Sequence, residues 1–176
     1  MTLASTYNTK LTILLFLILT LFILGTDAQS YQLDINLSTS MASARSDYLF
    51  GIQQEEDLNF TSATSVQITL PADYQGIMSD GSYNCYIASW ISGATINPIT
   101  CTLLGLTFTI SGAFTGIVGT LAVPVNTVYG FVINQLTNTM YAVTTAAFSG
   151  VFTNTATNTP ICTFETNFGI NGIQIT

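Results

Sequence analysis

Apolar and polar residues alternate along most of this chain, and that period restricts the fold more than any other feature of the sequence. Apolar side chains occupy every second position over residues 31–38, 48–52 and 65–70. Successive side chains of a β-strand point to opposite faces, so this alternation is typical of half-buried strands. Beyond the first thirty residues no run sustains a helical period. We therefore predict an all-β fold.

Further strand signals follow at intervals that suit a sandwich. Residues 83–91 are apolar on both faces, which predicts a central strand covered on both sides, or a strand that faces a partner. The remaining predicted strands are 99–103, 106–110, 121–123, 128–133, 140–143 and 161–168. Residues 71–82 and 153–160 are predicted loops. Eight to ten short strands separated by turn signals favour an antiparallel two-sheet, Ig-like sandwich.

The first 28 residues have the pattern of a secretory signal peptide. Lys10 precedes an apolar run over 11–24, and small residues at Thr26 and Ala28 form a cleavage site. The alternative is a retained anchor, but a membrane span needs about 20 apolar residues and this run is shorter. We expect cleavage after Ala28, with residues 29–176 forming one secreted, extracellular β-sandwich domain that has no membrane span.

The charge balance excludes several classes of partner. Only 6% of residues are charged, and removal of the leader takes away the one lysine and leaves Arg45 as the only cation. Binding to nucleic acid depends on lysine and arginine contacts to phosphates. We therefore expect no nucleic-acid partner and no adhesion to anionic lipid.

The chain contains no histidine, which removes most catalytic and metal chemistry. Ser-His-Asp and Cys-His arrangements cannot be built, nor can histidine-based zinc or copper sites. We expect no enzyme activity, no cofactor and no metal site. The one acidic cluster is Glu55, Glu56 and Asp57, which we interpret as a solvated turn, with a Ca²⁺ loop as the alternative. A hydrolase that uses carboxylates is a third hypothesis that no motif supports.

Three cysteines remain after the leader, as suits an oxidising compartment. Cys85 and Cys101 flank one connection and are the favoured disulfide, although a Cys101–Cys162 pair is also open. Cys162 is then either a buried thiol or the site of an intermolecular bond. Asn36 and Asn59 begin Asn-x-Ser/Thr triplets and are predicted N-glycosylation sites on the surface.

Residues 57–143 resemble the β-sandwich modules of large secreted and surface proteins of ciliated protozoa. The resemblance is carried by strand and cysteine patterns, which are SVQITLPADY (65–74), Cys85, Cys101, GLTFTISG (105–112), GTLAVPV (119–125) and GFVIN (130–134). Those modules usually occur in tandem and are often membrane-anchored, whereas we expect one unanchored module here. The resemblance implies an extracellular, non-catalytic module and assigns no active-site residue.

These observations favour an extracellular structural subunit of a coat, matrix or filament, with itself or other coat and matrix proteins as its partners. We expect it to assemble through strand edges, because an end strand can pair with the open sheet edge of a neighbour. The candidate strands are 31–38 and 161–168. The alternative is an extracellular adhesion module that binds a glycan or Ca²⁺ through Trp90, tyrosines and the carboxylates of 55–57 or 73–80.

Overall fold

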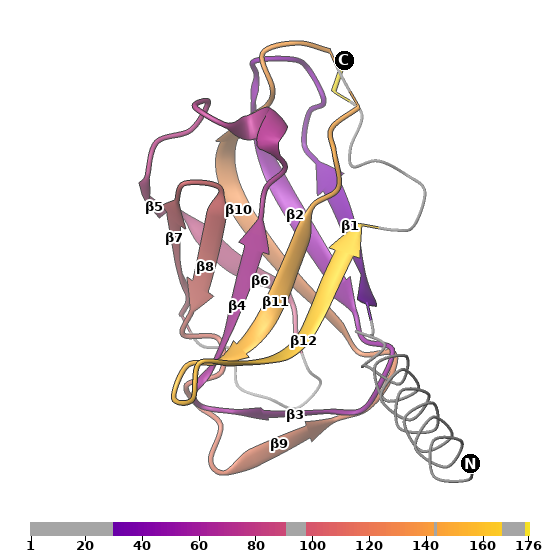
Figure 1. Cartoon of the computed structure of the whole chain (residues 1–176), viewed down its shortest axis with the longest axis vertical. Coiled ribbons are helices and arrows are strands. Elements are labelled where there is room, and N and C mark those ends of the chain that lie inside the picture. The colour runs from indigo at the N-terminus through magenta and orange to yellow at the C-terminus, as the bar shows by residue number, and fades with distance from the viewer. Residues whose placement is uncertain (1–29, 91–97, 143, 167–174) are drawn as a thin grey trace, which may run out of the picture.

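The computed structural model describes residues 30–90, 98–142, 144–166 and 175–176 (Figure 1). The predicted signal peptide lies outside the described residues. The part of the chain that is described contains strands and one short 3₁₀ helix. These elements are β1 Ser30–Leu37, β2 Arg45–Gln53, β3 Leu58–Thr61, β4 Thr64–Thr69, η1 Ala72–Tyr74, β5 Gly81–Tyr83, β6 Cys85–Ser89, β7 Thr100–Leu104, β8 Thr107–Ser111, β9 Thr120–Val123, β10 Val128–Thr137, β11 Ser149–Asn154 and β12 Thr159–Thr166. None of the described segments is a helix long and apolar enough to cross a membrane.

The strands form the two layers of a β-sandwich, as predicted. Ten of them are hydrogen-bonded in the order β5-β7-β8-β4-β11-β12-β1-β2-β10-β6, and β3 pairs with β9 across one end. In Figure 1 one layer, which contains β7, β8, β4, β11 and β12, lies in front of β2, β10 and β6. The layers connect where β12 and β1 pair side by side in parallel. That pair departs from the purely antiparallel arrangement expected from sequence.

The alternating pattern of the sequence fills the space between the layers with aromatic side chains. Along β2, the residues Tyr48, Phe50 and Ile52 are buried, and their neighbours on the strand are half-buried. Phe60 packs its ring 4.9 Å from that of Phe114 and 5.0 Å from that of Phe152, centroid to centroid. Burial of such apolar area is the main force that holds the layers together.

A disulfide joins β6, at one end of the ten-strand order, to β7, the second strand from the other end. Cys85 of β6 is bonded to Cys101 of β7, 16 residues further on, which confirms the favoured pairing. The chain also passes directly from β5 to β6 through Asn84 alone, so one continuous segment leaves one layer and enters the other. The two free edges of the sheet therefore lie on the same side of the sandwich.

The end strands of the chain are not free to pair with a neighbour, so this part of the prediction is wrong. β1, which covers most of the predicted 31–38, pairs with β2 on one side and β12 on the other. β12, which covers most of the predicted 161–168, lies between β1 and β11. Both strands are interior because the parallel β1–β12 contact connects the layers.

Three other expectations about strands are corrected. The predicted central strand 83–91 is split at Asn84, and β6 is an edge strand with Tyr86 half exposed. The pairing of β6 with β10 skips Ala88, and such a bulge interrupts an exposed edge. Residues 140–142 form no strand, and Val143 lies outside the described residues. The predictions also missed β3, β11 and most of β5, which begins at Gly81 inside the predicted loop 71–82.

Candidate functional site

One end of the sandwich is built on a buried asparagine. We call this end the upper pole; it comprises residues 38–44, 70–80, 104–106 and 138–142, at the top of Figure 1. Asn138 follows the end of β10 and its side chain is 0% exposed. Its Nδ2 donates hydrogen bonds to the carbonyl oxygens of Thr39 at 3.0 Å and Met41 at 2.8 Å. The Asn138 side chain therefore holds the 38–44 connection against the end of β10, together with a backbone hydrogen bond from the Asn138 N–H to the Ala44 carbonyl oxygen.

Two buried tyrosines complete this polar network. The Tyr48 hydroxyl donates to Asn138 Oδ1 at 2.6 Å and lies 2.8 Å from the Tyr74 hydroxyl. Burial raises the pKa of Tyr48 to about 12, although the hydrogen bond with Tyr74 lowers it. Burial, reinforced by the neighbouring Tyr48, holds the pKa of Tyr74 far above its usual range. Both hydroxyls stay protonated at neutral pH and act as structural hydrogen-bonding groups.

The opposite end of the sandwich contains a similar network, built on a buried glutamine. This lower pole comprises residues 54–57, 112–119, 124–128 and 155–158, at the bottom of Figure 1. Gln54, 1% exposed, accepts a hydrogen bond from the Tyr129 hydroxyl at 2.7 Å through Oε1. Its Nε2 donates to the carbonyl oxygens of Glu56, Val123 and Pro124. A buried amide bonded to a buried tyrosine thus fixes each pole, an arrangement that the sequence pattern did not predict.

Four aspartates link segments of the chain that are distant in the sequence. Each carboxylate accepts a hydrogen bond from a backbone N–H that is far away in the sequence. The contacts are Asp47 with Gln135 at 3.0 Å, Asp57 with Val125 at 2.8 Å, Asp73 with Ala146 at 2.8 Å and Asp80 with Gly105 at 2.7 Å. Such charge-assisted hydrogen bonds are stronger than neutral ones. These carboxylates therefore link distant segments of the chain, and the Asp47 contact joins strands β2 and β10.

The carboxylates proposed for Ca²⁺ or glycan binding are not brought together. Asp57, Asp73 and Asp80 serve three separate backbone contacts, while Glu55 and Glu56 are exposed on their turn. Within the described ranges, no three His, Cys, Asp or Glu side chains are placed to hold a metal ion.

Exposed apolar side chains are concentrated at the poles. Met41, Met140 and Tyr141 are 65%, 63% and 73% exposed and belong to adjoining connections, since Ser43 donates hydrogen bonds to the carbonyl oxygens of Thr139 and Met140. Tyr86 alone among the exposed large apolar residues of the described chain lies away from the poles. The others are Leu104 at the upper pole and Val118, Val125 and Val128 at the lower pole.

A polar depression of about 380 Å³ opens beside the upper pole. It contains Arg45, the only cation in the described chain. Its other lining residues supply mainly amides and hydroxyls, and they are Ile77, Met78, Ser79, Ser82, Tyr83, Asn84, Asn134, Gln135 and Thr137. Amides donate and accept hydrogen bonds and arginine donates to anions, so the depression suits a carboxylate.

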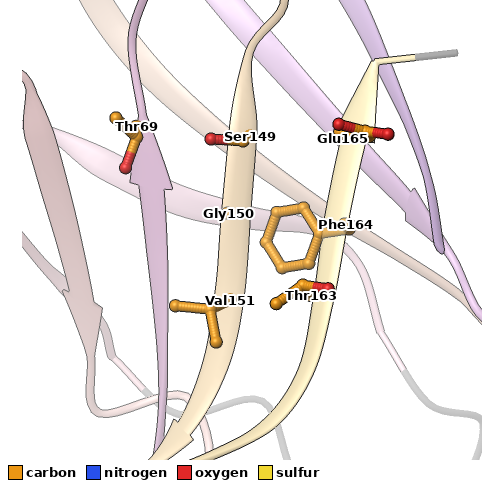
Figure 2. Close-up of a pocket in the computed structure, with 7 residues that line it drawn as sticks. All are labelled: Thr69, Ser149, Gly150, Val151, Thr163, Phe164 and Glu165. Atoms are coloured by element: carbon orange, nitrogen blue, oxygen red, sulfur yellow. The ribbon is translucent and has the colours of Figure 1, made fainter. Parts of the chain in front are cut away.

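A second depression, of about 340 Å³, lies across strands β4, β11 and β12 (Figure 2). Figure 2 shows the Phe164 ring beside Gly150, where a side chain on residue 150 would otherwise stand. A Cβ there would overlap this ring and the Gln67 carbonyl oxygen. The glycine therefore allows Phe164 to pack, and Glu165 is the one ionisable group that lines the depression.

The aromatic residue proposed for glycan stacking lies against the core. Trp90 is half-buried, with its ring centroid 5.0 Å from that of Phe114 and 5.8 Å from that of Tyr129. The Trp90 ring packs against these core rings, as the core alternative predicts. Asn36 on β1 and Asn59 on β3 are both exposed, as glycan acceptors must be, and their glycosylation stays a prediction.

Cys162 lies on β12, opposite Phe152 of β11, and packs against the core. Burial raises the pKa of its thiol to about 12, although a backbone hydrogen bond at Phe152 lowers it. A protonated thiol is a poor nucleophile for disulfide exchange. This environment favours the buried-thiol interpretation, and the intermolecular bond stays untested.

Comparison with known proteins gives little guidance on function. No protein-family model matches the chain, and no curated protein sequence matches it. One similar solved structure is an N-terminal interface mutant of a type II cohesin–X-dockerin complex from Acetivibrio cellulolyticus. It is 14% identical over 84% of this chain and 92% of that chain, with a TM-score of 0.34. A type II cohesin domain from the cellulosome of the same organism is 16% identical over 84% and 88%, with a TM-score of 0.25. Likeness at this level carries no argument about partner or function.

Proposed function

We propose that this chain is an extracellular, non-catalytic structural subunit that associates with copies of itself through its poles. The observation that carries the proposal is the concentration of exposed apolar side chains at both poles. Exposed apolar residues mark an interaction surface when they form a contiguous patch, whereas single exposed apolar residues are ordinary. Met41, Met140 and Tyr141 form such a group on connections that Asn138 holds in place.

The rest of the molecule supports this proposal. The Cys85–Cys101 disulfide suits an oxidising compartment outside the cell. Rigid poles favour association, because a surface that is already ordered loses less conformational entropy on binding. The network around Asn138 and the network around Gln54 supply that order.

Association through the poles replaces association through the end strands. β1 and β12 are interior, the edge strand β5 has only three residues, and the exposed edge of β6 is interrupted by the bulge at Ala88. Lateral strand pairing therefore has a poor template.

Sedimentation velocity of the purified secreted protein over a concentration series tests the proposal. We expect oligomers that grow with concentration. The variant Met41→Ser, Met140→Ser, Tyr141→Ser should weaken association at least about tenfold, since apolar burial drives most protein association. The matched control is Tyr86→Ser, which removes an exposed apolar residue from the β6 edge and should change little.

Two results would count against the proposal. A wild-type protein that stays monomeric at every concentration would refute self-association. Loss of association in Tyr86→Ser, with the pole variant unaffected, would place the contact at the strand edge instead.

A further inference from the structure

We infer that the Arg45 depression receives the Glu55–Glu56 turn of a second copy, so that copies join lower pole to upper pole. This inference rests on the proposed function and specifies which surfaces meet. Arg45 is the first residue of β2, and Glu55 lies two residues beyond the last residue of β2, Gln53. A strand of nine residues is about 30 Å long, so the two charges lie at opposite ends of one molecule.

The depression around Arg45 is formed by segments that are held in place. In β10, Asn134 and Gln135 form a bulge against β2, and the backbone N–H of Gln135 donates to Asp47 at 3.0 Å. The N–H of Asn134 donates to the Asn84 carbonyl oxygen at 2.9 Å. Gln135 has a φ of 60°, a left-handed conformation that is uncommon for a non-glycine residue. Bulges re-aim side chains, and this one places two amides beside Arg45.

The guanidinium group of Arg45 is available to a partner. Arg45 is exposed, and no hydrogen bond or ion pair engages its side chain within the described residues. A carboxylate that enters the depression would meet the guanidinium together with amide and hydroxyl donors.

The acidic turn is the matching surface at the lower pole. Glu55 and Glu56 are both exposed, and the turn is tied to residues 123–125 through Gln54 and Asp57. The turn is therefore presented in one conformation, as the depression is.

The net negative charge of the chain favours this orientation of two copies over others. The chain carries a net charge of −7, so most contacts between two copies bring like charges together. The contact at Arg45 is the one that offers a positive charge. An exposed ion pair adds little affinity, but it selects register and rejects other orientations. Because the two surfaces are different and lie at opposite ends of one molecule, the contact is heterologous and repeats from copy to copy, and it forms an open chain where the rotation between copies does not close a ring.

Charge reversal tests the contact. The two variants are Arg45→Glu and the double variant Glu55→Arg, Glu56→Arg. Each should associate at least about tenfold more weakly than wild type in sedimentation velocity, because the contact becomes repulsive. A 1:1 mixture of the two variants should restore association, because each pole again meets the opposite charge. Asp34→Arg is the control for the Glu55→Arg, Glu56→Arg variant, because it also makes the net charge less negative by reversing an exposed acidic residue, here on β1 and away from both poles.

The outcomes separate this inference from the proposed function. If wild type associates and the Glu55→Arg, Glu56→Arg variant weakens it no more than Asp34→Arg does, the inference is wrong and the proposed function stands. If wild type does not associate, both are wrong. A further experiment is titration of the wild-type protein with glucuronate, which tests the depression as a site for an acidic saccharide. Saturable binding that Arg45→Glu abolishes, with association unchanged in that variant, would assign the depression to an acidic saccharide and overturn the contact between copies.

Discussion

Asn138→Ala should be among the most damaging substitutions of a polar residue in this chain. The side chain is fully buried and makes three hydrogen bonds, with the Tyr48 hydroxyl and with the carbonyl oxygens of Thr39 and Met41. A typical internal hydrogen bond contributes about 1 kcal/mol, and a buried partner left without one costs more. We therefore expect the free energy of unfolding to fall by about 3 kcal/mol.

Urea denaturation at pH 7, followed by the fluorescence of Trp90, measures this loss. Gln75→Ala is the matched control, because it removes an exposed amide and should change the stability by no more than about 0.5 kcal/mol. A double-mutant cycle with Tyr48→Phe should give a coupling energy above about 0.5 kcal/mol, since the two side chains share a hydrogen bond. A loss below about 1 kcal/mol in Asn138→Ala would refute the view that this network anchors the upper pole.

Three further predictions concern the body of the sandwich. Gly150→Ala should lower the free energy of unfolding in urea by about 1–3 kcal/mol, because the new methyl group overlaps the Phe164 ring. The control is Gly51→Ala, which has room for a Cβ and should be close to neutral. Equal effects of the two substitutions would contradict the packing argument. Stability should fall as pH rises from 9.0 towards about 12, by at most about 1.4 kcal/mol per pH unit for Cys162, because the unfolded thiol loses its proton before the folded one does. Cys162→Ala should remove that part of the fall in stability. If the variant and wild type lose stability equally over this pH range, the thiol is not desolvated in the folded protein. Replacing both Cys85 and Cys101 by alanine should cost about 3 kcal/mol in thermal denaturation, and a variant as stable as wild type would show that the bond does not constrain the chain.

Alternation identified the strands whose faces differ in polarity. The residues predicted over 31–38 and 65–70 correspond to β1 and β4, because one face of each strand is more deeply buried than the other. The predicted strands 99–103 and 106–110 correspond to β7 and β8, which are joined by a turn at Gly105, where φ is 61°. Strand β11 was missed because Gly150 interrupts its apolar face, a gap that Phe164 of the neighbouring strand fills.

Which strand lies beside which could not be predicted, because pairing depends on contacts between distant residues. The 83–91 run reads as central because it is apolar on both faces, yet Asn84 divides it between the two layers. The favoured disulfide was predicted because Cys85 and Cys101 flank a single connection, and the two cysteines are bonded between β6 and β7 in the structure.

The anchoring residues of the poles have no local signature. Gln54 and Asn138 are single amides just beyond strand ends, and amides in such places are ordinary loop residues by composition. Their importance comes from burial and from tyrosines more than seventy residues away. The one available signal is that each follows a strand with buried tyrosine on its inward face.

Electron microscopy of the secreted protein tests the central claim most directly, which is that copies join end to end through rigid poles. We predict unbranched chains, one sandwich wide, that lengthen as the protein concentration rises under native ionic conditions. Single particles of uniform size at the highest concentration would contradict the claim.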